Sequence, residues 1–176
     1  MYDVVLLIEK ALSEADASQV AGLHESLEEP VRYHVILPCE DAASRIETAL
    51  GSIAASEVLA TSAMSYPEMD LDELQREIRG EAQKSLDVSV GFMQATGHEV
   101  TGEVSSQNPI EALAVSVESR TAAEAIILTR PHIVSEFFHL DWTSKARRRI
   151  GVPCLHLLEH ENFDEQAGQG EGVTGM

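Results

Sequence analysis

Short aliphatic runs alternate with amphipathic stretches along this chain. Runs rich in valine, isoleucine and leucine occur at residues 4–8, 31–37, 125–128 and 154–158. Such runs are typical of strands that are buried on both faces of a parallel sheet. A thinner strand is predicted over 98–104, where Val100 and Val104 are the aliphatic residues. A strand with so few apolar side chains is expected at the edge of the sheet.

The stretches between these runs have helical spacing. Residues 70–96 carry one apolar stripe at steps of three and four, formed by Leu71, Leu74, Ile78, Ala82, Leu86, Val90 and Met93. Gly97 suits the left-handed residue that follows a helix. An earlier helix is predicted to begin within 13–16 and to place Val20, Leu23 and Leu27 on one face before Pro30 ends it.

Two further helices are predicted from their starting residues. Asn108 is an N-cap, Pro109 takes the first helical position and Glu111 is able to reach back to the cap, with an apolar face at Ile110, Leu113, Ala114 and Val117. Asp141 caps a helix over 142–150, which Gly151 and Pro153 end.

Strands and helices therefore alternate five times, which predicts an α/β fold with a parallel sheet, right-handed crossovers and helices on both faces. Residues 1–160 are predicted to form a single domain. Within it, residues 39–69 form a partly helical insertion, with a short helix over 42–55. Residues 161–176 form a flexible, acidic, glycine-rich tail, because this composition buries too little apolar surface to become ordered.

Charge and composition exclude several functions. The chain has 176 residues and a formal net charge of −18, which disfavours binding to nucleic acid because a phosphate polymer is repelled. No apolar run reaches the roughly 20 residues that span a bilayer, so no membrane is expected. The amino-terminal residues lack the features of a signal peptide, which predicts a cytoplasmic protein in which Cys39 and Cys154 are free thiols; a redox pair is the alternative.

Specific motifs appear from residue 97 onward. The segment GHEVTGEVSSQNPIEALAVSVESRTAAEAIILTR (97–130) resembles the third strand, third helix and fourth strand of the universal stress protein family. The segment RRRIGVPCLHLLE (147–159) resembles the closing helix and last strand of that family, and the order of elements over most of 2–160 also matches. The resemblance implies strand order 3-2-1-4-5 and a homodimer that pairs through the last strand, from Val152 to Leu158.

The resemblance also directs attention to the loop after the fourth strand. Ligands of open parallel sheets bind at the carboxyl ends of the strands, where the strand order reverses. Nucleotide-binding members of the family carry glycines there, spaced as Gly, two residues, Gly, nine residues, Gly and then Ser or Thr, because glycine lets backbone N–H groups approach phosphates. The corresponding region here, from Thr129 to Thr143, contains no glycine. Glu9 stands near the position of the family's aspartate after the first strand.

The usual ATP site is therefore predicted to be lost, for two reasons. Pro131 removes an amide donor, and Asp141 places a carboxylate near the phosphate position. The candidate residues of a degenerate nucleotide site are Glu9, Thr129, Arg130, His132, Asp141, Thr143 and Ser144. Phe137, Phe138 and Trp142 either fill the space of a nucleotide or line a pocket for a flat ligand.

The leading hypothesis is a non-catalytic protein of regulation or protein interaction that uses no cofactor, since the sequence offers no candidate nucleophile or metal set. The alternative is a protein that holds ATP or AMP through Arg130, His132, Thr143 and Ser144. Residues 145–149 concentrate cations, which serve the end of a helix or, alternatively, dock an acidic partner or the acidic tail.

Overall fold

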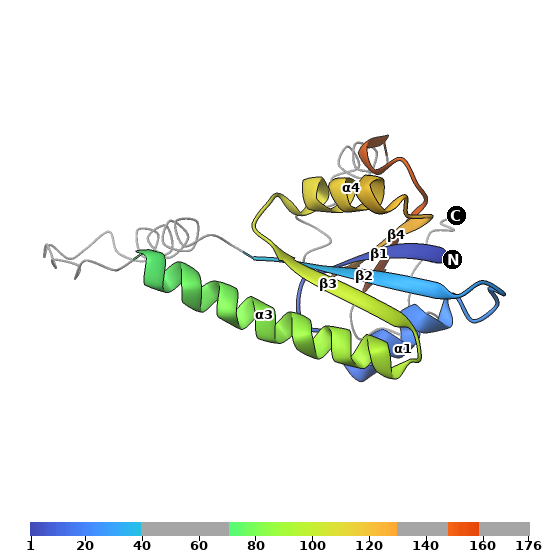
Figure 1. Ribbon diagram of the computed structural model, residues 1–176, viewed down its shortest axis with the longest axis horizontal. Coiled ribbons are helices and arrows are strands. Elements are labelled where there is room, and N and C mark those ends of the chain that lie inside the picture. Colours follow the sequence, from blue (N-terminus) through green and yellow to red (C-terminus); the bar gives the residue numbers. More distant parts are fainter. Residues whose placement is uncertain (40–70, 130–147, 159–176) are drawn as a thin grey trace, which may run out of the picture.

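A five-stranded sheet forms the centre of the molecule (Figure 1). The computed structural model describes residues 1–39, 71–129 and 148–158. The strand order is β3-β2-β1-β4-β5, and each neighbouring pair is parallel. The strands are β1 (Tyr2–Ile8), β2 (Val31–Pro38), β3 (Glu99–Ser105), β4 (Glu124–Thr129) and β5 (Cys154–Leu158). This confirms the predicted fold class and the strand order that the family resemblance implied.

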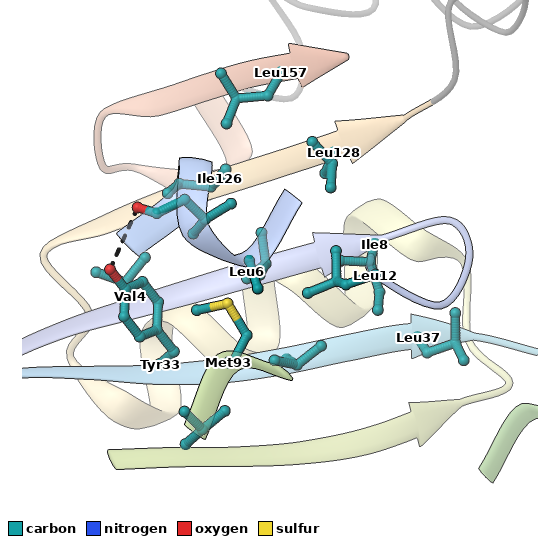
Figure 2. Close-up of a cluster of buried hydrophobic side chains, with 14 of the residues drawn as sticks. Val4, Leu6, Ile8, Leu12, Tyr33, Leu37, Met93, Ile126, Leu128 and Leu157 are labelled. Atoms are coloured by element: carbon teal, nitrogen blue, oxygen red, sulfur yellow. Dashed lines mark hydrogen bonds between the residues drawn. The ribbon is translucent and has the colours of Figure 1, made fainter. Parts of the chain in front are cut away.

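Both faces of the sheet are covered, which explains the unbroken aliphatic runs. The helices α1 (Glu14–Gly22) and α3 (Leu71–Ala95) lie on one face, and α4 (Pro109–Arg120) lies on the other (Figure 1). In β1, Val4, Leu6 and Ile8 pack toward α1 and α3 (Figure 2). Val5 and Leu7 pack toward α4. Since alternate residues of a strand point to opposite faces, each needs to be apolar.

The helix α3 follows its predicted stripe. Ile78, Leu86 and Met93 are buried, and Met93 lies within the cluster drawn in Figure 2. Burial of a side chain such as Met93 contributes about 1.5–3 kcal/mol relative to exposure. Gly97 follows the helix with φ of 91°, the left-handed conformation that its position predicts.

The helix α1 begins as predicted but ends early. Ser13 is its N-cap, and Ser13 and Asp16 form a capping box. The helix ends at Gly22, so the prediction that it continues to Pro30 is wrong, and Leu27 is exposed. The physical reason is His24, which is buried and bonded to other elements of the fold, so that the chain after Gly22 turns inward.

The helix α4 also begins as predicted. The Asn108 side chain accepts a hydrogen bond from the Ile110 N–H, and Pro109 occupies the first turn. The carboxylate of Glu111 accepts a hydrogen bond at 2.6 Å from the guanidinium of Arg149, which joins α4 to the segment before β5. Arg149, one cation of the basic run at 145–149, is therefore paired with a carboxylate.

Several predictions lie outside the described residues: the insertion beyond Cys39 with its helix over 42–55, most of the helix over 142–150, and the tail at 161–176. Residues 148–150 are helical, and Gly151 follows them with φ of 74°. Cys39 is buried and Cys154 is partly buried. Within the described ranges, no helix is long and apolar enough to cross a membrane.

Candidate functional site

The strand order reverses between β1 and β4. The chain leaves β1 toward β2 and β3 on one side, whereas β4 and β5 lie on the other side. Glu9 follows β1 and Thr129 ends β4. The Glu9 N–H donates to the carbonyl oxygen of Leu128 at 3.3 Å, which holds the two strand ends together. Two of the predicted site residues, Glu9 and Thr129, therefore lie on neighbouring strand ends at the point where such sheets bind ligands.

The other five predicted site residues lie outside the described residues: Arg130, His132, Asp141, Thr143 and Ser144. The aromatic residues Phe137, Phe138 and Trp142 also lie outside them. Their roles at the site stay predictions.

The loop between β1 and α1 is hydrogen-bonded to α3. Leu12 is buried, and its N–H donates to the hydroxyl oxygen of Ser89 at 2.9 Å. The Ser89 hydroxyl in turn donates to the carbonyl oxygen of Ser85 at 2.8 Å. Ser89 is fully buried, so both bonds are made away from water and hold the loop after Glu9 in place. The sequence signal for this contact is a serine on the apolar stripe of α3.

Ser13 and Asp16 bond to each other at the amino terminus of α1. The Asp16 N–H donates to the Ser13 hydroxyl oxygen at 3.1 Å, and the Ser13 N–H donates to the Asp16 carboxylate at 2.9 Å. The same carboxylate accepts a bond of 2.6 Å from the Ser13 hydroxyl. A carboxylate thus occupies the position where a phosphate would meet the helix N-terminus, so this end of α1 does not favour a nucleotide.

A histidine that the sequence reasoning missed lies beside Thr129. His156 of β5 is half-buried, and its Nε2 lies 2.8 Å from the Thr129 hydroxyl oxygen. Burial lowers the pKa of His156, so the imidazole is neutral at pH 7 and offers one donor and one acceptor. The available signal was a polar residue in the middle of the aliphatic strand Cys154–Leu158.

A second polar cluster lies at the opposite, amino end of the strands. Nδ1 of His24 lies 2.7 Å from the Tyr33 hydroxyl, and Nε2 of His24 lies 2.8 Å from the Glu124 carboxylate. The Tyr2 hydroxyl donates to the same carboxylate at 3.1 Å. Tyr33 is fully buried, and burial together with Glu124 raises its pKa, so its proton stays in place. This cluster ties the turn after α1 to β2 and β4, and its burial suits a structural role rather than contact with a ligand.

The backbone conformations also differ between the two ends of the sheet. Among the described residues, the positive φ angles occur at Gly97, Thr121 and Gly151. Each of these precedes the amino end of a strand, namely β3, β4 and β5. The described residues at the carboxyl ends thus adopt no left-handed conformation of the kind that aims successive amides at an anion.

At the carboxyl ends of the neighbouring strands β1 and β4, the described residues offer a carboxylate (Glu9) and a hydroxyl (Thr129), with the neutral imidazole of His156 bonded to that hydroxyl. In the part of the chain that the structure describes, no group of three or more His, Cys, Asp or Glu residues is placed to hold a metal ion.

Comparison with known proteins supports the fold. No sequence-family model matches the chain, and no curated protein matches it either. The hypothetical protein MJ0577 superposes with a TM-score of 0.60 at 13% identity, over 92% of this chain and 99% of that one. A universal stress protein family protein from Arabidopsis thaliana, solved with AMP bound, gives 0.52 at 10% identity, over 94% and 95%. The hypothetical protein PH0823 gives 0.50 at 15% identity, over 93% and 99%. The chain therefore has a universal stress protein-like fold.

Proposed function

We propose that this chain is a divergent universal stress-like protein that serves regulation or protein interaction and does not bind ATP in the usual family mode. It acts without catalysis. One observation carries the proposal: the fold is that of an AMP-bound protein, while the segment after β4, from Thr129 to Thr143, contains no glycine. Without glycine, backbone amides are kept from close contact with phosphate oxygens.

The described part of the candidate site supports this proposal. Glu9 adds a carboxylate at the end of β1, and Asp16 adds a second one at the start of α1. Ser13 and Asp16 use each other's hydrogen-bonding groups. A nucleotide at this edge would lie near negative charge and near an Asp16 amide that is already bonded to Ser13, both of which disfavour phosphate.

The alternative is an adenine-nucleotide-binding protein that uses a modified loop at 129–144. The observation that favours it is the Arabidopsis thaliana relative with AMP bound, which shares the fold over nearly its whole length. In this case Thr129 takes part in the site, since it is the described candidate nearest in sequence to the others. Nε2 of His156 lies 2.8 Å from its hydroxyl oxygen.

Titration with ATP, ADP and AMP separates the two. The full chain is heated in about 1 mM of each nucleotide and also examined by calorimetry. A dissociation constant one hundred times below the nucleotide concentration would raise the free energy of unfolding by about 2.7 kcal/mol. A gain of that size raises the melting temperature by several degrees.

We expect no saturable shift and no heat of binding with any of the three nucleotides. The protein from Arabidopsis thaliana serves as the positive control. A saturable shift with this chain contradicts the leading proposal and supports the alternative.

We also propose that the protein forms a homodimer through β5, as an interaction module with a second copy of itself. β5 is an edge strand, and the residues Cys154–Leu158 include no acidic or basic side chain apart from His156, whose pKa is lowered by burial. Leu155 is 36% exposed on this strand. An edge strand that lacks fixed charges and exposes an apolar side chain favours pairing with a second copy. A cytoplasmic location remains a prediction of the sequence.

A further inference from the structure

A buried histidine lies between a guanidinium and a carboxylate on the α4 side of the sheet. His34 of β2 is 4% exposed. Its Nε2 lies 3.0 Å from Nη2 of Arg120, the last residue of α4, and 3.3 Å from Oε1 of Glu103 in β3. Its Nδ1 lies 2.7 Å from the Thr101 hydroxyl. One imidazole thus joins a helix to the edge of the sheet.

The shorter of the two contacts of Nε2, with Arg120 at 3.0 Å, implies one protonation state of His34. A guanidinium only donates hydrogen bonds, so Nε2 of His34 accepts the bond from Arg120. Nδ1 therefore carries the proton and donates it to the Thr101 hydroxyl. With Nε2 as the acceptor, His34 carries one proton and no charge, and Arg120 is held by this imidazole and by the hydroxyl of Ser116, at 3.3 Å from its Nε.

A second proton makes this arrangement impossible. Protonated Nε2 loses its lone pair and no longer accepts from Arg120, and two cations then face each other across 3.0 Å. The Glu103 carboxylate, at 3.3 Å, becomes the acceptor that the imidazolium requires. Glu103 is half exposed, which leaves it free to move toward the ring.

We propose that His34 is a proton-operated switch: protonation exchanges Arg120 for Glu103 as the partner of Nε2, and so releases the last turn of α4 from β2. The proton comes from solvent, and no bond other than hydrogen bonds changes. Arg120 then moves to the solvent at the helix end, where a cation still complements the helix dipole.

The surroundings of His34 contain the charged groups that bear on this exchange. From β1, the residue opposite is the apolar Val5. On β2, Arg32 is paired with Asp3 of β1 at 2.6 Å and lies 3.7 Å from Glu99 of β3. Among the described residues, the side chains that contact the His34 ring with polar or charged atoms are Thr101 and Glu103 from β3 and Arg120 from α4. Arg32 has carboxylates of its own, so Arg120 and Glu103 are the pair that compete for His34.

The direction of the pH dependence follows from burial. Burial lowers the pKa of His34, Arg120 lowers it further, and the hydrogen bond of Glu103 opposes them. The pKa in the folded protein thus lies below the ordinary value of 6.5. Between these two pKa values the unfolded chain binds more protons, so the stability that neutral His34 provides is present above pH 6.5 and is lost as the pH falls through the folded pKa.

The test is an NMR titration of the full chain from about pH 8 to about pH 4.5, with the imidazole resonances of His34 assigned by triple-resonance experiments. Arg120→Gln is expected to raise the pKa of His34, and Glu103→Gln to lower it, each by about half a unit to one unit for partly exposed partners. Arg149→Gln is the matched control, since Arg149 is an exposed cation paired with Glu111, and it leaves the pKa unchanged. The same direction of shift for both variants, or no shift, overturns the proposal.

Amide hydrogen exchange tests the structural consequence. The last turn of α4, residues 117–120, is expected to lose protection at pH 5 relative to pH 7.5 after correction for intrinsic exchange rates. In Arg120→Gln the link is absent at both pH values, so its protection no longer depends on pH. Equal protection of the native chain at both pH values overturns the switch.

Discussion

The strands at the two ends of the strand order, β3 and β5, differ in the side chains that they carry. β3 carries Glu99 and Glu103, whose side chains are 58% and 53% exposed. β5 has five residues without a carboxylate or a permanent cation, and Leu155 on it is 36% exposed. Charged side chains on an edge strand oppose pairing with another chain, because desolvating them is costly.

The comparison teaches that the side chains of β3 oppose pairing with another chain, whereas those of β5 do not. β3 also packs against α3 through Gly102, where an added Cβ would lie 2.9 Å from a methyl carbon of Leu86. β3 can therefore carry few apolar side chains, because α3 packs closely against it at Gly102. β5 instead buries Leu157 and exposes Leu155 on the same face, so an apolar side chain of this strand is accessible.

The largest effect is expected from the buried side of β5. Leu157→Ala removes a side chain that is 1% exposed and leaves a cavity, so the free energy of unfolding is expected to fall by about 2–5 kcal/mol. Val88→Ala on α3 is the control, because Val88 is 49% exposed and its change is expected to stay within about 0.5 kcal/mol. Urea denaturation measures both. Equal losses in the two variants would show that β5 is not packed as described.

The exposed side of β5 tests the proposed dimer. Leu155→Glu places a carboxylate in a paired edge, where an unpaired buried charge costs on the order of 3 kcal/mol, or more than a hundredfold in the dissociation constant of the dimer. Sedimentation of the native chain is expected to show a dimer and that of the variant a monomer. Val88→Glu introduces the same charge elsewhere and is expected to leave the dimer intact. A native chain that is monomeric at micromolar concentration contradicts pairing through β5.

A smaller effect is expected at the other edge. Gly102→Ala in β3 pushes a methyl group against Leu86 and Val90, at 2.9 and 3.0 Å, and overpacking of this kind costs about 1–3 kcal/mol. Gly80→Ala in α3 is the matched control, since a Cβ there meets nothing within 4 Å. That change is expected to stabilise the protein by about 0.5–1 kcal/mol through the helix propensity of alanine. Thermal unfolding of the two variants in opposite directions supports close contact of β3 with α3, whereas stabilisation by both contradicts it.

Much of the fold was predictable because its signals are local. The strand at Cys154–Leu158 was predicted with its observed bounds, and the stripe of α3 gave its buried face. Asn108 and Gly97 marked helix ends through their own backbone chemistry. Such signals depend on residues within one turn or one strand of each other, so a sequence displays them directly.

The misses concern contacts between distant residues. The early end of α1 depends on His24. This residue bonds to Tyr33, which is 9 residues away in the sequence, and to Glu124, which is 100 residues away. The contact of Ser89 with Leu12 spans 77 residues, and that of His156 with Thr129 spans 27. The helical spacing of Leu23 and Leu27 gave no sign of these partners. Of the candidate site, the sequence correctly brought Glu9 and Thr129 to adjacent strand ends because the resemblance implied the order of strands.

The central position of β1 has a consequence during synthesis. Both of its edges are paired, with β2 on one side and β4 on the other, and Val4 is paired with Glu124. The partner on the β4 side is made about 120 residues after β1, which takes on the order of ten seconds at the usual pace of a ribosome. During that interval an aliphatic strand has one unsatisfied edge in the nascent chain. The β4 side of β1 can therefore pair only after residues 124–129 have left the exit tunnel.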